Sequence, residues 1–275
     1  MKTDIFPINY FKSVWTPIQA FKNRHKLNGF QLILVLVFLN GLMTIPVTLN
    51  YATLDFMPLE EFYPNAVKII DEKAMEVIQT NRFDNGQMFI ETPFHVENDY
   101  GVVAGHGEAS AGEELEDVNR YIYFEENQFL INEEGSPLTS VLYTKDFRLD
   151  DLESVEEIRH ELSRQWFNQN RIFIVLFFSL MISAFMFIMT LFVVLGSAFL
   201  LYLTKKSTVT AINTYKESVN LVLNSLTLPT VVAMIMGVLH FDVTIMVTIQ
   251  TVGLIVMLFV IYYKTYFNDD RLTRA

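Results

Sequence analysis

Long apolar stretches without charge alternate along this chain with a single block rich in acidic residues. Four stretches carry no Asp, Glu, Lys or Arg, namely Phe30–Leu49, Ile172–Thr204, Ser218–Leu239 and Val243–Tyr263. A helix of about 20 apolar residues crosses the ~30 Å hydrocarbon core of a bilayer, and each stretch reaches that length. The pattern predicts an α-helical membrane protein with four transmembrane helices and an α+β extracytoplasmic domain between the first and the second.

These stretches divide the chain into four parts. We expect a cytoplasmic amphipathic segment at 1–28, transmembrane helix 1 at 29–49, an acidic extracytoplasmic α+β domain at 50–170, and a three-helix transmembrane region with a short cytoplasmic loop and tail at 171–275. The first apolar run is longer than the core of a typical signal peptide and precedes no A-x-A cleavage site. We therefore expect it to stay in the protein as a span.

The net charge of −11 hides a strong asymmetry along the chain. Residues 50–171 hold 26 acidic and nine basic residues, whereas the rest of the chain holds five acidic and 11 basic ones. Short loops rich in Lys and Arg stay on the cytoplasmic side of a membrane. Both termini and the loop Lys205–Glu217 are therefore expected inside, and the acidic block outside. Such an acidic domain would repel phosphate, which excludes nucleic acid as a partner.

The segment Ile5–Lys26 has the spacing of an amphipathic helix. Five apolar residues recur three or four positions apart and share one face: Phe11, Val14, Trp15, Ile18 and Phe21. In a helix lying in the membrane plane, the basic residues would contact lipid headgroups; they are Lys12, Lys22, Arg24 and Lys26. Alternatively, the apolar face packs on the protein's own cytoplasmic loop. Pro17 would either bend this helix or begin a second short one.

The second apolar stretch is longer than a membrane requires. Its 33 residues would extend ~50 Å as a helix, and the preceding Leu149–Asn170 also has helical spacing. We therefore expect one continuous or gently kinked helix through both segments.

The acidic block shows first a helical and then an alternating pattern. Apolar residues recur with helical spacing over Glu60–Thr80. Short runs then predict strands separated by Asn- and Gly-containing turns; the runs are Gln87–Ile90, Tyr100–Val103, Arg120–Phe124, Gln128–Ile131 and Ser140–Tyr143. Tyr121–Phe124 and Phe129–Ile131 should form a hairpin. We expect an α+β domain with a small, mostly antiparallel sheet.

The cytoplasmic entry to the third span is the best candidate for a partner-contact site. Asn220 and Asn224 lie four residues apart and share a helix face, and Lys216 and Glu217 precede them. A polar face at this depth must meet another helix, water or a partner protein. Contact with a partner and adhesion between the protein's own helices are both compatible with this pattern.

The sequence contains no recognisable catalytic motif. Cysteine is absent, and G-x-x-x-x-G-K-[ST], H-E-x-x-H and G-x-S-x-G do not occur. His95 and His106 stand among acids at a spacing that matches no metal motif, and the acidic clusters fit a solvated face better than a Ca²⁺ loop. We therefore assign no catalytic residue, cofactor or metal. The expected spans also lack ionisable residues, which weighs against a secondary transporter acting alone.

Four short sequences are shared with a known family. They are Phe11–Pro17 (FKSVWTP), Leu142–Asp146 (LYTKD), Tyr215–Ser218 (YKES) and Asn224–Pro229 (NSLTLP). With them the chain resembles a membrane family of Gram-positive bacteria, of unknown function, in which some members are named maltodextrin-utilisation protein MalA. The resemblance implies a plasma-membrane location in a Gram-positive bacterium and a link to maltodextrin uptake or its regulation. It transfers no site residue.

We therefore expect a non-enzymatic, multi-pass plasma-membrane protein that is an accessory or regulatory component of maltodextrin or sugar uptake. Its expected partners are the lipid bilayer and a membrane transporter or ATPase subunit, and no feature of the chain specifies an oligomeric state. The alternative is a transport permease subunit coupled to a separate ATPase, because one span, a large outer domain and three further spans is also the layout of FtsX- and MacB-type permeases. A membrane-bound hydrolase using paired outer carboxylates is a third hypothesis.

Overall fold

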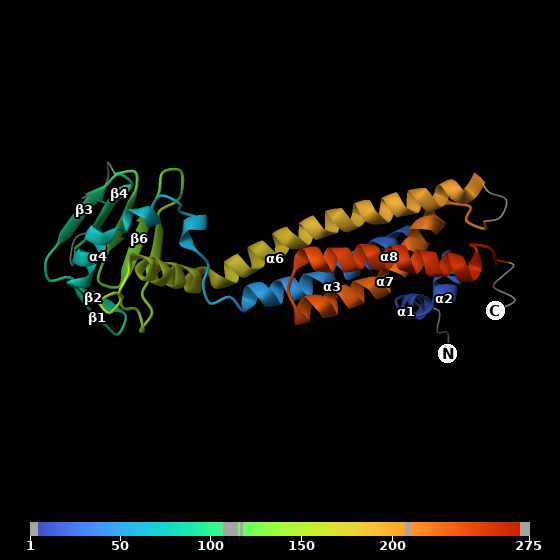
Figure 1. The fold of residues 1–275 in the computed structure, drawn as a ribbon, viewed down its shortest axis with the longest axis horizontal. Coiled ribbons are helices and arrows are strands. Elements are labelled where there is room, and N and C mark those ends of the chain that lie inside the picture. The colour runs from blue at the N-terminus through green and yellow to red at the C-terminus, as the bar shows by residue number, and fades with distance from the viewer. Residues whose placement is uncertain (1–4, 107–114, 116–117, 207–209, 270–275) are drawn as a thin grey trace. The chain divides into compact units, whose positions relative to one another are not determined.

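The computed structural model describes residues 5–106, 115, 118–206 and 210–269 (Figure 1). The chain folds into two compact units. The helical unit comprises Met1–Thr53 and Val175–Ala275, and the mixed unit comprises Leu54–Ile174. Each unit has its own core and is described separately.

Long helices dominate the helical unit. They are α3 (Gly29–Ala52), the later part of α6 (Val155–Leu203), α7 (Tyr215–Leu239) and α8 (Val243–Thr265). All four helices are long and apolar enough to cross a membrane. The four expected apolar helices, with a sheet-containing unit between the first and the second, are thus confirmed. A short 3-10 turn, η3 (Thr204–Lys206), follows α6.

The expected continuous helix is also confirmed, because α6 runs unbroken for 49 residues. It begins at Val155, however, and not at Leu149. A reciprocal cap sets this start: Ser154 Oγ accepts the N–H of Glu157 at 3.2 Å, and the Glu157 carboxylate accepts the N–H of Glu153 at 2.7 Å. The first bond satisfies a donor of the first helical turn, and the second ties residue 153, which lies before the helix, to that turn.

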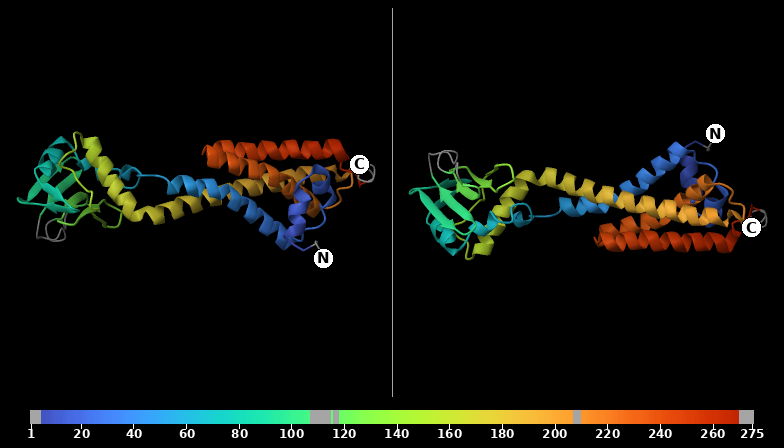
Figure 2. Two further views of the ribbon diagram at one scale, coloured as in Figure 1. Left: turned by 90° about the horizontal axis from the view of Figure 1, so that it is seen from below. Right: turned by 90° about the horizontal axis from the view of Figure 1, so that it is seen from above.

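The amino-terminal segment forms two short helices, which is one of the two outcomes expected from Pro17. They are α1 (Ile8–Val14) and α2 (Pro17–Lys22). Pro17 suits the first position of α2 because that position needs no N–H donor, and Thr16 Oγ1 accepts the N–H of Gln19 at 3.2 Å. Both short helices contact α7, and α2 also contacts α8. Figure 2 shows them together at one end of the long helices.

Polar side chains connect the long helices at mid-length. Asn40 of α3 donates to Ser183 Oγ of α6 at 2.8 Å, and Gln250 of α8 donates to Thr230 Oγ1 of α7 at 2.9 Å. Buried amides and hydroxyls between apolar helices find their partners in one another. α7 is the most buried of the four helices and lies between α3 and α8.

The mixed unit contains a two-stranded sheet, β1-β2, and a five-stranded sheet of order β3-β4-β5-β6-β7. The strands are β1 (Arg82–Asp84), β2 (Gln87–Phe89), β3 (Phe94–Asn98), β4 (Gly101–Gly105), β5 (Tyr121–Phe124), β6 (Gln128–Asn132) and β7 (Thr139–Leu142). Among the described strands, only β4 and β5 pair in parallel, and the β5–β6 hairpin pairs Tyr121 with Asn132. The mostly antiparallel sheet and this hairpin are confirmed, whereas β1 and β3 were not expected.

The helical spacing over Glu60–Thr80 predicts too long a helix. Only α4 (Glu72–Gln79) is α-helical, after the 3-10 turns η1 (Leu59–Glu61) and η2 (Val67–Ile69). The buried carboxylate of Glu133 accepts the N–H of Ala66 at 2.9 Å, which withholds that donor from a helix. Asp71 then caps α4 by accepting the N–H of Ala74 at 2.9 Å.

Side chains of α6 cover the free edge of β7. Gln169 donates to the carbonyl of Ser140 at 2.8 Å and accepts the N–H of Leu142 at 2.8 Å. Gln165 accepts the N–H of Thr144 at 2.9 Å. These amides take the place of a neighbouring strand and satisfy backbone groups that an edge strand leaves open.

Candidate functional site

The strongest candidate site is a buried polar joint where α1, α2 and residues 23–28 meet the first half of α7. Asn220 donates to the carbonyl of Leu27 at 3.2 Å, and Asn224 donates to the carbonyl of Ala20 at 3.2 Å. Carbonyls near the end of a helix lack intrahelical donors. The two amides of α7 supply such donors to the segment that leads from α2 into α3.

This geometry corrects the expectation that Asn220 and Asn224 contact a partner. Their exposed fractions are 0% and 1%, because α1 and α2 fold back over this face of α7. Both amides therefore hold the protein's own chain together, which was the alternative interpretation. Of the four candidate residues, only Lys216 is exposed.

Glu217 has a local structural role at the start of α7. Its carboxylate accepts the hydroxyl of Thr214 at 3.0 Å and the N–H of Asn213 at 3.0 Å. In return, Thr214 Oγ1 accepts the N–H of Glu217 at 3.2 Å. This reciprocal cap fixes the first turn of α7. Its polar atoms are thus engaged within the chain.

Arg24 is the central residue of the joint, a role that no sequence pattern indicated. Its side chain is 1% exposed and donates to both carboxylate oxygens of Asp269, at 2.9 and 2.7 Å. It also donates to the carbonyls of Phe21 at 3.1 Å and Ala211 at 3.2 Å. The expectation that Arg24 meets lipid headgroups is therefore wrong. Asp269 lies 245 positions away, so no local pattern could have indicated the pair.

A strained turn after α8 brings the carboxyl-terminal segment to the joint. Tyr266 and Phe267 have φ angles of 52° and 53°, which residues with side chains rarely adopt. The N–H of Ala211 donates to the carbonyl of Phe267 at 2.7 Å, and the Phe267 ring lies 5.9 Å from that of Phe21. Surrounding contacts must over-determine such a turn for it to persist. Three segments distant in sequence, at residues 21–24, 211 and 267–269, are thus held together at Arg24.

The polar groups of the joint suit a structural role, the attachment of α1 and α2 to α7, better than a catalytic one. Most of its polar groups bond to one another or to backbone carbonyls, as when the Tyr10 hydroxyl bonds the Thr227 hydroxyl. Among the described residues, the buried Arg24 Nε and the amide oxygens of Asn220 and Asn224 have no hydrogen-bond partner. Across the described part of the chain, no group of three or more His, Asp or Glu residues is placed to hold a metal ion. The arrangement can keep α1 and α2 in position against α7.

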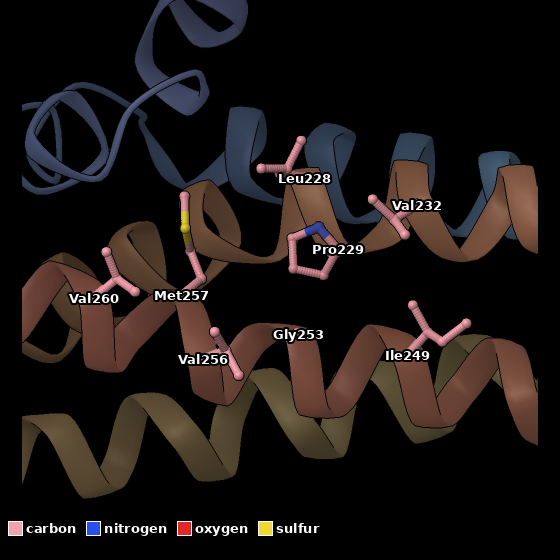
Figure 3. Close-up of a pocket in the computed structure, with 8 residues that line it drawn as sticks. All are labelled: Leu228, Pro229, Val232, Ile249, Gly253, Val256, Met257 and Val260. Carbon is pink, nitrogen blue, oxygen red and sulfur yellow. The ribbon is translucent and has the colours of Figure 1, made fainter.

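An apolar groove of about 230 Å³ lies between α7 and α8. Figure 3 shows Pro229 of α7 above Gly253 of α8, with aliphatic side chains on both sides. A Cβ on Gly253 would lie 2.7 Å from the Pro229 Cβ, so glycine is needed for this close approach. The lining offers no polar side chain, and the groove therefore suits only an apolar occupant.

A polar hollow of about 380 Å³ lies beside the turn between β3 and β4 in the mixed unit. Its lining includes His95, Glu97, Tyr100 and Arg120. The Lys68 ammonium lies 5.5 Å from the centre of the Tyr100 ring. A half-exposed ring among groups of both charges could accept a small polar ligand, and the sequence pattern did not single out these residues together.

Comparison with known proteins decides the family. A family model described as "Protein of unknown function (DUF1189)" matches residues 10–264. The chain belongs to the DUF1189 family. The maltodextrose utilization protein MalA of Streptococcus pneumoniae is 30% identical to this DUF1189 protein over 267 residues, 96% of this chain and 97% of that protein. YvdJ of Bacillus subtilis, whose name also refers to maltodextrin utilization, is 23% identical over 96% of this chain and 92% of its own length. No solved structure matches.

The sequences that resembled the family have identifiable roles in this DUF1189 protein. FKSVWTP runs from α1 through the Thr16 cap into α2, and YKES opens α7. NSLTLP carries Asn224 and the hydroxyl of Thr227, both of which contact the amino-terminal helices. Three of the four sequences therefore meet in or beside the joint. LYTKD instead lies in the mixed unit, where it contacts α6.

Proposed function

We propose that this DUF1189 protein spans the plasma membrane of a Gram-positive bacterium four times and acts as a non-enzymatic accessory component of maltodextrin uptake. One observation carries the membrane assignment. Large apolar side chains cover the outer faces of the long helices, with Leu180 73%, Phe192 71% and Leu239 75% exposed. Contiguous apolar surface of this extent is unfavourable in water, and lipid would cover it.

Charge supports the orientation of the spans. Lys205 follows α6 and Lys216 opens α7, so the loop between these helices is basic and belongs on the cytoplasmic side. The amino-terminal helices share that side because they contact the same end of α7. With four spans, both termini are cytoplasmic and the acidic mixed unit faces outward.

We infer the link to maltodextrin uptake from the names of two related proteins. Two proteins that match nearly the full chain carry names that refer to maltodextrose or maltodextrin utilization. The joint supports an accessory rather than a catalytic role, because its buried polar groups fasten the chain to itself. Lys216 is exposed beside the joint and would contact a transporter on the cytoplasmic side.

The cysteine-free chain offers a direct test of orientation. Single cysteines are placed at Glu91, exposed in the mixed unit, and at Lys205, exposed after α6. A membrane-impermeant maleimide should label Glu91→Cys in intact cells and Lys205→Cys only after permeabilisation. The reverse pattern, or labelling of both in intact cells, would refute the proposed topology.

The accessory role is tested by deleting the gene and measuring uptake of labelled maltodextrin, with glucose uptake as the control. We expect maltodextrin uptake alone to fall. Purified protein should release no sugar from maltodextrin, and turnover that depends on an outer carboxylate would support the hydrolase hypothesis instead. Unchanged maltodextrin uptake would refute the accessory role.

The partner is tested by a photo-crosslinking residue at Lys216, with Leu239 at the other end of α7 as the control position. Capture of a membrane-embedded sugar transporter subunit from Lys216 alone supports the proposal. Capture of a nucleotide-binding protein supports the permease alternative, and no specific capture contradicts a role for this surface.

A further inference from the structure

A second apolar groove lies between α1, α3 and α7 in the helical unit. Its volume is about 230 Å³. The side walls are Phe11 of α1 and Trp15 directly after it, Phe38 and Leu42 of α3, and Leu228 and Val231 of α7. Leu228 also borders the groove of Figure 3, so the two grooves flank one ridge of α7.

The inside of this groove suits an alkyl chain. Thr227 is its one polar lining residue, and that hydroxyl is already bonded to Tyr10 and donates to the carbonyl of Leu223 at 3.0 Å. The Phe11 and Phe38 rings meet edge to face at 5.7 Å and form one wall. An occupant therefore gains by burying apolar surface and finds no free polar partner inside.

The rim of the groove differs from its interior. Trp15 is 71% exposed, and Lys12 lies three residues earlier on the same side of α1, also exposed. Within the described part of the chain, no carboxylate pairs with the Lys12 ammonium. Residues 5–54 contain four Lys and Arg and no Asp or Glu. Helical spacing places the Lys12 cation on the side of Trp15, outside the apolar lining itself. An indole with a cation on its side complements an anionic headgroup at the membrane surface.

We propose that this groove binds an anionic phospholipid, with one acyl chain along Phe38 and Val231 and the headgroup phosphate on Lys12. The inference rests on the proposed membrane location and adds a lipid preference to it. The anionic lipid would belong to the cytoplasmic leaflet, which would fasten α1 in the membrane plane while the polar joint holds α2. The groove between α7 and α8 has no indole at its lining and serves as an internal comparison.

Trp15 provides the probe, because the chain has two tryptophans and the other, Trp166, lies in the mixed unit. Trp166→Phe protein is reconstituted into phosphatidylcholine vesicles that carry an equal minor fraction of brominated phosphatidylglycerol or brominated phosphatidylcholine. We expect phosphatidylglycerol to quench Trp15 about fivefold more efficiently, the ratio that corresponds to ~1 kcal/mol per basic residue at an anionic surface.

Two charge variants and one volume variant distinguish headgroup binding at Lys12 from general attraction of anionic lipid to basic residues, and test whether the acyl chain occupies the groove. Lys12→Gln should equalise the two lipids, whereas Lys205→Gln, an equal loss of charge at the end of α6, should leave the preference intact. Val231→Phe should reduce quenching by both lipids because it fills the groove. Equal quenching in the parent protein would overturn the lipid proposal while leaving the membrane location standing. Failure of the protein to float with the vesicles would instead count against the membrane location.

A second readout avoids the Trp166 substitution. The unaltered protein is purified in mild detergent from vesicles with both unbrominated lipids, and the retained lipid is identified by native mass spectrometry. Phosphatidylglycerol should be enriched about fivefold over its vesicle fraction, and Lys12→Gln should lose that enrichment. Retention in proportion to the vesicle composition would overturn the proposal.

Discussion

Arg24→Met is the sharpest test of the joint, because methionine keeps an apolar stem and removes every hydrogen-bond donor. The guanidinium donates to Asp269 at 2.9 and 2.7 Å and to the carbonyls of Phe21 and Ala211 at 3.1 and 3.2 Å. Its Nε lies 3.9 Å from the carboxylate of Glu217, which is 12% exposed. The substitution therefore removes the charged donor of two carbonyls and of the Asp269 carboxylate. It also removes the guanidinium near Glu217, a carboxylate that His25 Nδ1 approaches at 3.6 Å.

The magnitude follows from these contacts. The Phe21 carbonyl keeps the backbone N–H of residue 24 at 3.2 Å and the Ala211 carbonyl keeps the Asn213 amide at 3.3 Å. Each carbonyl therefore loses only its charged hydrogen bond, which costs about 1–2 kcal/mol. Asp269 is 54% exposed, so water replaces the lost partner and this pair adds only about 0–1 kcal/mol. Relief from burying a charge offsets part of the total. We expect a net loss of about 2–4 kcal/mol, or a fall in Tm of roughly 5–12 °C for a protein of this size.

The assay is thermal unfolding of the full chain in mild detergent, together with hydrogen exchange. Asp269→Asn is the matched control and should cost no more than about 1 kcal/mol, because the carbonyl contacts of Arg24 survive. Amides of α1 and α2 should exchange faster in Arg24→Met, and those of the five-stranded sheet should not. The reasoning fails if Arg24→Met unfolds within about half a kcal/mol of the parent, or if Asp269→Asn is equally damaging.

Three further outcomes are expected. Asn224→Leu should lower the unfolding free energy by about 1–2 kcal/mol through the carbonyl it leaves unbonded, measured by thermal unfolding against an exposed α7 substitution. Gly253→Val should cost about 1–3 kcal/mol, because a Cβ there would lie 2.7 Å from the Pro229 Cβ; an unchanged Tm would contradict that packing. Asp146 has a lowered pKa, chiefly because the Thr144 hydroxyl bonds its carboxylate, then through its own backbone N–H and through Arg164. Its stabilising contribution should be present at neutral pH and lost as pH falls below about 4, a loss that Asp146→Asn should abolish in Tm measured against pH.

The sequence pattern correctly predicted the elements that depend only on residues close together in the chain. Apolar length alone predicted α3, α6, α7 and α8, and short alternating runs around a turn predicted the β5–β6 hairpin. Where side chains from elsewhere compete for backbone donors, the same reasoning failed. Glu133 takes the N–H of Ala66 and prevents the helix that the spacing over Glu60–Thr80 predicted.

The sequence by itself determined that the chain has four apolar helices around a mixed unit, because burial length and periodicity are properties of consecutive residues. Only the tertiary structure decided what the polar residues at the helix ends do. Asn220 and Asn224 share a face by spacing, yet the carbonyls that they satisfy belong to residues 27 and 20. The sequence pattern predicted that Arg24 contacts lipid headgroups, whereas in the structure it bonds Asp269, 245 positions away. Pairings of this kind depend on how the chain returns on itself, and no window of neighbouring residues encodes that path.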